Sequence, residues 1–151
     1  MLRLAGVRAL VIEDHEDTRD LFCTILQHAG ATVDCHARSS AAIEAVDASR
    51  PDVIIADLQM AADDVRLMSI IQERLGRPVP AICVTGHARA EDHERARRAG
   101  FQEYIVKPFH PDRLIEAVER VLIKPAAGQE QLSMPSDAPE ALSPLPGTTP
   151  E

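Results

Sequence analysis

The sequence predicts an open, doubly wound α/β fold with a parallel sheet, and three observations lead to this expectation. Five short apolar runs alternate with five longer segments of helical period. The runs are mostly continuous in hydrophobicity, as is typical of parallel strands buried on both faces. The longer segments have the length of crossover helices, which right-handed connections place on both faces of such a sheet. The expected strands are 7–13, 32–35, 53–57, 81–85 and 101–106, and the expected helices are 16–29, 39–49, 63–75, 89–99 and 111–123.

The ends of the expected elements carry the residues that such ends favour. Helix 16–29 is followed by Gly30 and helix 89–99 by Gly100, and glycine is common just beyond a helix C-terminus. The last helix begins with Pro111, which suits the first helical turn. His110 precedes it where Asp or Ser would cap better, so we expect a looser or pH-sensitive turn. One apolar stripe runs along this helix, formed by Leu114, Ile115, Val118, Val121 and Leu122.

Composition divides the chain into a domain, residues 1–124, and a flexible Pro-rich tail or linker remnant, residues 125–151. The total of 151 residues suits one domain. Six of the 11 prolines fall in the last 27 residues, which contain four acidic residues, no basic residue and no aromatic residue. Such a segment buries too little apolar surface to offset the entropy lost on ordering.

Composition also argues against several kinds of partner and compartment. The net charge is −8 and aromatic residues make up only 3%, so we expect no direct binding of nucleic acid or of an anionic membrane. We expect no signal peptide, and the sequence shows no run long enough to span a membrane, so we expect a cytoplasmic protein. Cys23, Cys35 and Cys83 lie in apolar runs, and we expect reduced, packed thiols. The six histidines show no zinc-ligand spacing. They are interpreted as surface or packing residues, except His15 and His87, which closely follow candidate site residues.

Polar and charged residues gather where the expected strands end. Glu13 and Asp14 end the first strand, Asp57 ends the third, Thr85 ends the fourth and Lys107 follows the fifth. In open α/β sheets the functional site lies beyond the carboxyl ends of the strands. Each residue alone has an ordinary structural explanation, such as a turn or a helix cap, but no structural role requires all of them together. Three neighbouring carboxylates repel one another unless a cation joins them, which indicates a site for Mg²⁺.

These residues lie in four short motifs: the acidic pair Glu13-Asp14, Asp57-Leu58-Gln59-Met60, Val84-Thr85-Gly86-His87-Ala88 and Tyr104-Ile105-Val106-Lys107-Pro108-Phe109. With these motifs, residues 7–123 resemble the response-regulator receiver domain of two-component signalling. The resemblance implies a flavodoxin-like (βα)5 fold with strand order 2-1-3-4-5 and a bacterial signalling domain rather than an enzyme that acts on a separate substrate.

The resemblance also implies a role for each residue of the motifs. Asp57 would accept a phosphoryl group, and Mg²⁺ would be held by Asp14, Asp57 and the main-chain carbonyl of Gln59, with Glu13 acting through a metal-bound water. A carboxylate can act as a nucleophile toward a phosphoryl group, and the protein mainly aligns groups and neutralises charge.

Further implied roles concern charge stabilisation, switching and partners. Lys107 and Thr85 would contact the phosphoryl oxygens, and Thr85 with Tyr104 would form a switch. The phosphoryl donor would be a histidine kinase or a histidine phosphotransfer protein. A downstream protein partner, or a second copy in a homodimer, would bind the face formed by the fourth helix, fifth strand and fifth helix.

The sequence departs from the family pattern in the loop after Asp57. Ala61 stands where proline is common, and the glycine often found shortly beyond is missing. This departure concerns the conformation of the loop and leaves the nucleophile in place.

Several functional hypotheses stay open at this stage. The chain could be a stand-alone receiver, or the receiver portion of a larger regulator or hybrid kinase whose output module is absent. It could be a degenerate receiver that serves only as an interaction module, although every phosphorylation residue is present. An aspartyl-phosphate phosphatase of the haloacid dehalogenase type also uses a strand-end Asp and Mg²⁺, but it requires a second Asp where Gln59 stands.

Overall fold

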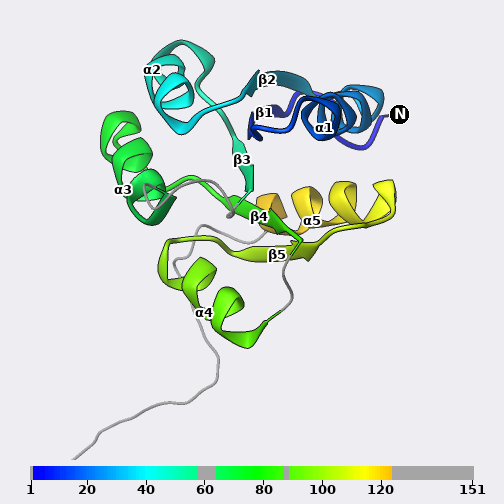
Figure 1. The fold of residues 1–151 in the computed structure, drawn as a ribbon. Coiled ribbons are helices and arrows are strands. Elements are labelled where there is room, and N and C mark those ends of the chain that lie inside the picture. Colours follow the sequence, from blue (N-terminus) through cyan, green and yellow to red (C-terminus); the bar gives the residue numbers. More distant parts are fainter. Residues whose placement is uncertain (1, 58–63, 87–88, 124–151) are drawn as a thin grey trace, which may run out of the picture.

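The computed structural model describes residues 2–57, 64–86 and 89–123 of the chain. Five strands alternate with five helices, as the hydrophobic pattern predicted (Figure 1). In chain order they are β1 (Arg8–Ile12), α1 (Glu16–His28), β2 (Thr32–His36), α2 (Ser39–Ser49), β3 (Val53–Asp57), α3 (Asp64–Leu75), β4 (Ala81–Thr85), α4 (Ala90–Arg98), β5 (Glu103–Val106) and α5 (Pro111–Ile123).

The strands form one parallel sheet in the order β2-β1-β3-β4-β5, which confirms the expected topology. The first strand of the chain, β1, therefore lies inside the sheet, and β2 and β5 form its edges. In this order β1 and β3 are neighbours, with Val11 beside Ile55. The carboxyl ends of β1, β3, β4 and β5 consequently lie along one edge of the sheet.

Alternation along the strands divides the apolar core into two layers. Val11, Ile55 and Val84 face α1 and α5, whereas Leu10 and Ile54, one position away, face α2, α3 and α4. Figure 1 shows α1 and α5 on one side of the sheet and the other three helices on the opposite side. Successive side chains of a strand point to opposite faces, so a continuous apolar run fills both layers.

The expected helix stops at Gly30 and Gly100 are confirmed by their hydrogen bonds. Gly30 N–H donates to Gln27 O and the following Ala31 N–H to Leu26 O, and the same pair of bonds recurs around Gly100. Both glycines have positive φ, 103° and 104°. This left-handed turn satisfies the last carbonyl groups of each helix. Strand β5 starts two residues later than predicted, because Phe101 N–H completes the stop of α4 by donating to Ala96 O.

The turn before α5 differs from the expectation of a loose end. His110 Nδ1 accepts a hydrogen bond from the Asp112 N–H at 3.2 Å, so the imidazole acts as a cap. His15 has the same role at α1, where its Nδ1 accepts from the Thr18 N–H at 3.3 Å. A neutral imidazole nitrogen is an acceptor, which lets histidine take the place of Asp or Ser at a helix start.

The cysteine prediction is wrong for two of the three residues. The structure joins Cys23 of α1 to Cys35 of β2 in a disulfide, with Cα atoms 7.0 Å apart, and only Cys83 is a free, buried thiol. Both partners lie where α1 packs on the edge strand β2, and the sequence does not reveal that helix face and strand face meet. Among the described residues, no helix combines the length and apolar character that a bilayer span requires.

Candidate functional site

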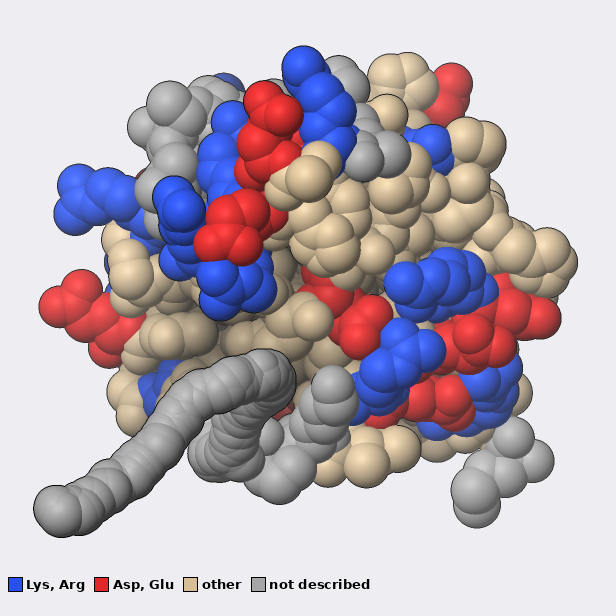
Figure 2. Space-filling model, turned by 90° about the horizontal axis from the view of Figure 1, so that it is seen from below, with Lys and Arg blue, Asp and Glu red and all other residues tan. Residues whose placement is uncertain are grey.

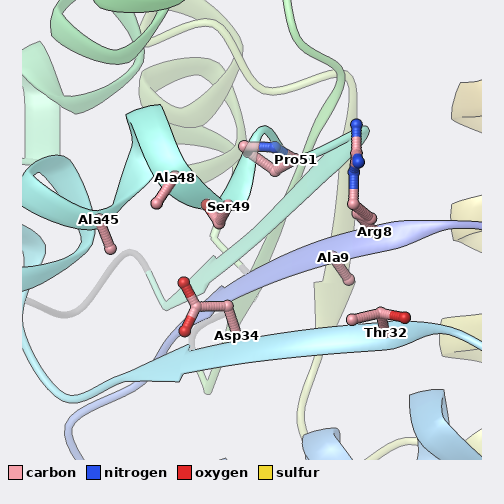
Figure 3. Close-up of a pocket in the computed structure, with 8 residues that line it drawn as sticks. All are labelled: Arg8, Ala9, Thr32, Asp34, Ala45, Ala48, Ser49 and Pro51. Atoms are coloured by element: carbon pink, nitrogen blue, oxygen red, sulfur yellow. The ribbon is translucent and has the colours of Figure 1, made fainter.

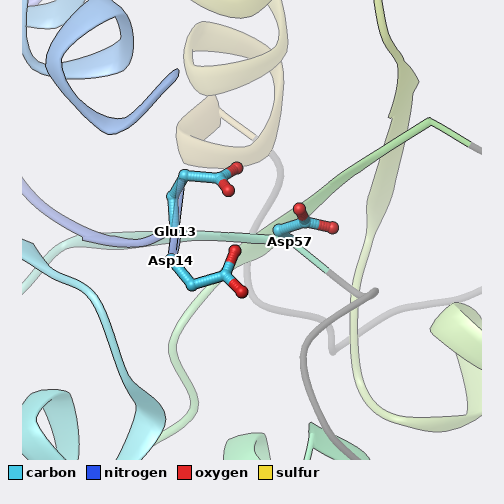
Figure 4. A group of neighbouring side chains, drawn as sticks. All are labelled: Glu13, Asp14 and Asp57. Atoms are coloured by element: carbon cyan, nitrogen blue, oxygen red, sulfur yellow. The ribbon is translucent and has the colours of Figure 1, made fainter. Parts of the chain in front are cut away.

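The strand-end residues predicted from the sequence come together at the carboxyl edge of the sheet. Glu13 and Asp14 directly follow β1, and Asp57 is the last residue of β3, the neighbouring strand. One oxygen from each of these three carboxylates lies within 4.8 Å of the others. Figure 4 shows Glu13 and Asp14 extending toward Asp57 from the adjacent strand.

The three carboxylates differ in their contact with solvent. Glu13 and Asp57 are buried, whereas Asp14 is exposed at the mouth of the site. A divalent cation with oxygen ligands fits this arrangement, because Mg²⁺ binds through one or two carboxylates and keeps several waters. The buried pair would supply negative charge and the exposed side would admit water and a phosphate.

Lys107, which directly follows β5, links the two buried carboxylates. Its Nζ lies 3.0 Å from Glu13 Oε1 and 3.1 Å from Asp57 Oδ2. Burial lowers the pKa of Lys107, but the hydrogen bonds to Glu13 and Asp57 outweigh it, so the pKa is raised above its usual value of 10.5. The site therefore contains a charged ammonium that bridges β1 and β3 from the end of β5.

Glu13 is held at several atoms at once. Its N–H donates to His36 O at 2.9 Å, its carbonyl accepts from Arg19 at 3.0 Å, and its Oε2 accepts from the His15 N–H at 3.1 Å. Burial raises the pKa of Glu13, and the charge of Asp57 acts in the same direction, against the hydrogen bonds from His15 and Lys107. The carboxylate is thus hydrogen-bonded both to Lys107 and to the β1–α1 turn.

Arg19 and His36 were not predicted to belong to the site. Both act on the backbone of Glu13, Arg19 through its guanidinium and His36 through its own carbonyl. Contacts to main-chain groups carry almost no signal in a sequence. The only available clue was that Arg19 begins the second turn of the helix that directly follows the acidic pair.

Thr85 and Tyr104 lie on adjacent strands of the same sheet. Thr85 is buried at the end of β4, and its carbonyl accepts from the Lys107 N–H at 2.7 Å. Tyr104 of β5 lies beside Cys83 in register, two positions before Thr85. Side chains two residues apart on a strand share a face, so Thr85 and Tyr104 project to the same side of the sheet as diagonal neighbours.

One predicted ligand cannot be placed. Gln59, whose main-chain carbonyl was expected to bind Mg²⁺, lies outside the described residues, as do Ala61 and the other residues from 58 to 63. The other predicted site residues all lie within the described part of the chain.

A separate groove of about 390 Å³ lies between α2 and the neighbouring strands β1 and β2. It is at the start of β1, where Arg8 stands, whereas the acidic site follows the end of that strand. Small side chains on α2 leave this space open (Figure 3). The lining residues are Arg8, Ala9, Thr32, Asp34, Ala45, Ala48, Ser49 and Pro51.

The arginines of α4 are paired with acids of the same helix. Glu94 contacts Arg97 at 2.6 Å and Arg98 at 3.1 Å, and Asp92 contacts Arg95 at 3.4 Å. Figure 2 shows basic and acidic side chains next to one another over the face that it displays. Such pairing within one helix is typical of a solvated helix face.

Comparison with known proteins gives matches that cover most of the described fold. Residues 9–119 match the family described as the response regulator receiver domain. A 14.6 kDa protein of Leptolyngbya boryana is 34% identical over 122 residues, which are 80% of this chain and 93% of that protein. The phosphate regulon transcriptional regulatory protein PhoB of Escherichia coli is 27% identical over 131 residues, 84% of this chain but only 57% of PhoB.

Solved structures of proteins named NtrX and CheY4 also match this chain. The Vibrio cholerae chemotaxis protein CheY4 is 26% identical and superposes with a TM-score of 0.71 over 78% of this chain and 100% of CheY4. NtrX of Brucella abortus, solved in complex with ATP, is 30% identical with a TM-score of 0.67 over 76% of this chain and 26% of NtrX. The chain thus corresponds to the whole of a small relative and to a part of the larger regulators. Since the family match spans all five strands except the first residue of β1, the chain belongs to the response regulator receiver domain family.

Proposed function

We propose that this receiver accepts a phosphoryl group on Asp57 in a Mg²⁺-dependent reaction. The observation that carries the proposal is the position of Lys107, whose ammonium bonds both Asp57 and Glu13 while Asp14 lies within reach of the same two carboxylates. No packing requirement explains a lysine and three carboxylates brought from three strands to one point. A receiving nucleophile, a cation site and a fixed positive charge are the parts that phosphoryl transfer needs.

In the proposed transfer, a carboxylate oxygen of Asp57 attacks the phosphorus of a phosphohistidine. The new bond joins Asp57 to phosphorus, and the phosphorus–nitrogen bond breaks with its electron pair left on the imidazole of the donor. Lys107, already 3.1 Å from Asp57 Oδ2, stabilises the charge on the phosphoryl oxygens. The buried Thr85 hydroxyl donates a hydrogen bond to one of those oxygens after transfer.

The metal would be held by Asp14, Asp57 and the main-chain carbonyl of Gln59, with Glu13 acting through a bound water. When bound, Mg²⁺ supplies positive charge against the phosphoryl oxygens and so offsets their repulsion from the acidic residues. Glu13 keeps its position through Lys107 and the His15 N–H, so it can orient a water without moving.

The proposed output is a change of packing that a partner reads. Thr85 moves toward the phosphoryl group, and the Tyr104 ring, on the same face of the sheet, turns into the space released. The face formed by α4, β5 and α5 would then bind a downstream protein or a second copy. The donor is a histidine kinase or a histidine phosphotransfer protein, and we place the reaction in a bacterial cytoplasm, with no direct role for nucleic acid or membrane.

A second possibility is that this receiver is one part of a longer regulator, and its coverage of two relatives favours this possibility. The chain spans 57% of PhoB and 26% of the NtrX structure, whose remaining parts it does not match. Residues 125–151 would then be a linker remnant toward an output module. The family match leaves the phosphatase hypothesis of the haloacid dehalogenase type without support.

Intact-mass measurement tests the proposal. The full chain is incubated with a small acyl phosphate, with and without Mg²⁺, beside Asp57→Asn and the exposed matched control Asp20→Asn. We expect wild type and Asp20→Asn to gain the mass of one phosphoryl group only when Mg²⁺ is present. Equal labelling of Asp57→Asn would refute the assignment.

A further inference from the structure

The only tyrosine of the chain is stacked on a histidine. The rings of Tyr104 on β5 and His93 on α4 have centroids 4.4 Å apart and an interplanar angle of 18°. His93 is otherwise exposed, and Tyr104 is half-buried at the edge of the core layer beneath α4. From the sequence alone, His93 is interpreted only as a surface or packing residue.

Helix α4 provides a fixed support for this histidine. Ala96, one turn further along, is buried against the sheet, and the neighbouring Asp92 is 7% exposed and contacts Arg89 and Arg95. The C-terminus of the helix is closed by the Gly100 stop. The His93 ring is therefore presented to Tyr104 by a helix whose inner face is packed.

Tyr104 lies between two different neighbours. His93 covers its ring from α4, and Thr85 lies diagonally along the same face of the sheet, toward the phosphoacceptor edge. A turn of the ring toward Thr85 would separate it from the imidazole. The stack stabilises the position that Tyr104 now has and opposes the turned position.

We propose that His93 is a positioning residue that holds Tyr104 against α4 and sets the balance between its two ring positions. The proposal rests on the Thr85–Tyr104 coupling described above. Unstacking would also release the imidazole on the exposed side of α4, so that the turn of a half-buried ring alters the surface offered to a partner. His93 thus connects the interior switch to the α4 face.

The size of the effect follows from the strength of aromatic pairs. Stacked pairs contribute beyond their buried area by an amount equivalent to about a two- to tenfold change in an equilibrium constant. Loss of the stack in His93→Ala should raise the ratio of turned to stacked Tyr104 by this factor before any phosphorylation. His93→Phe keeps a flat ring and should restore the stacked position.

The test uses the spectroscopic isolation of Tyr104. Because the chain has only one tyrosine, ring-labelled tyrosine gives NMR signals from this residue alone, and cross-peaks between its ring protons and the Thr85 methyl group report its position. The cross-peaks are measured on the full, unphosphorylated chain for wild type, His93→Ala and His93→Phe. His28→Ala, which removes another exposed helix histidine at the end of α1, is the matched control.

We expect stronger cross-peaks between the Tyr104 ring and the Thr85 methyl group in His93→Ala, and wild-type cross-peaks in His28→Ala and His93→Phe. Wild-type cross-peaks in His93→Ala would overturn the proposal, and so would His93→Phe cross-peaks as strong as those of His93→Ala. A final arm adds the acyl phosphate. If phosphorylated wild type keeps unchanged cross-peaks while His93→Ala strengthens them, positioning by His93 stands and the phosphorylation-linked switch fails.

Discussion

At the scale of single residues, the site depends on one ammonium between two buried carboxylates. Lys107 is within 3.1 Å of Asp57 and 3.0 Å of Glu13, whereas Asp14 is exposed and makes no ion pair among those found in the described residues. The acidic residues thus differ in their described contacts. Glu13 and Asp57 share the lysine, whereas Asp14, in the proposed site, would contact a cation together with Asp57.

This division predicts different effects on metal binding. Asp14→Ala should abolish Mg²⁺ binding, because it removes a carboxylate that would contact the metal. Lys107→Ala should retain binding, since it removes a positive charge from the same site, yet lose the response to phosphorylation. Calorimetric titration with Mg²⁺ compares the two with Asp17→Ala, an exposed acid in the first turn of α1. Wild-type affinity in Asp14→Ala would disprove this assignment of ligands.

The buried Glu13 predicts a specific pH dependence of stability. Burial raises its pKa above 4.5, so the folded state binds more protons than the unfolded state in the window above that value. Its contribution to the free energy of unfolding must then fall as pH rises from about 4.5 toward neutrality. Urea titrations in the presence of a chelator should show Glu13→Gln gaining on wild type over this window. A difference that is constant with pH would show that burial does not shift this carboxyl.

At the scale of elements, most of the fold was predictable because each strand is short, continuous and apolar. The topology predicted from this pattern places the acidic pair, Asp57 and Lys107 at one edge of the sheet. Contacts between elements were less accessible. The Cys23–Cys35 pairing, the Arg19 and His36 contacts to Glu13, and the His93 stack depend on which faces meet, and local sequence contains little information about that.

The close packing around Gly30, which ends α1, can be tested at this scale. A Cβ on Gly30 would lie 2.8 Å from the Leu2 Cβ and 3.1 Å from the Ala5 nitrogen, at a φ of 103°. Gly76 also has positive φ, 72°, but a Cβ there meets no heavy atom of the described residues within 4 Å. Gly30→Ala should therefore cost about 1–3 kcal/mol more than Gly76→Ala. Equal losses in denaturant titrations would mean that the N-terminal segment does not pack closely on this turn.

At the scale of the whole molecule, helices within the described residues cover both core layers. Helix α5 completes one layer through Leu114, Ala117, Val118 and Val121. The tail has the proline-rich composition of a linker, and its residues lie outside the described structure. The described core therefore contains the groups that we expect to determine both stability and phosphorylation.

Truncation after residue 124 should accordingly leave the melting temperature and the phosphorylation yield unchanged. Truncation after residue 112, which removes most of α5, is the contrasting variant and should prevent folding. Thermal melts followed by circular dichroism distinguish them. A drop of several degrees in the first variant would mean that the tail stabilises the domain.

The central claim is that Asp57 receives the phosphoryl group, and chemical mapping tests it most directly. Borohydride reduces an aspartyl phosphate to homoserine, so peptide sequencing by mass spectrometry reads the modified position after the full chain has been phosphorylated with Mg²⁺ present. We predict homoserine at position 57 alone, and none when Mg²⁺ is chelated. Homoserine at position 14, or phosphorylated protein with no homoserine at position 57, would contradict the account.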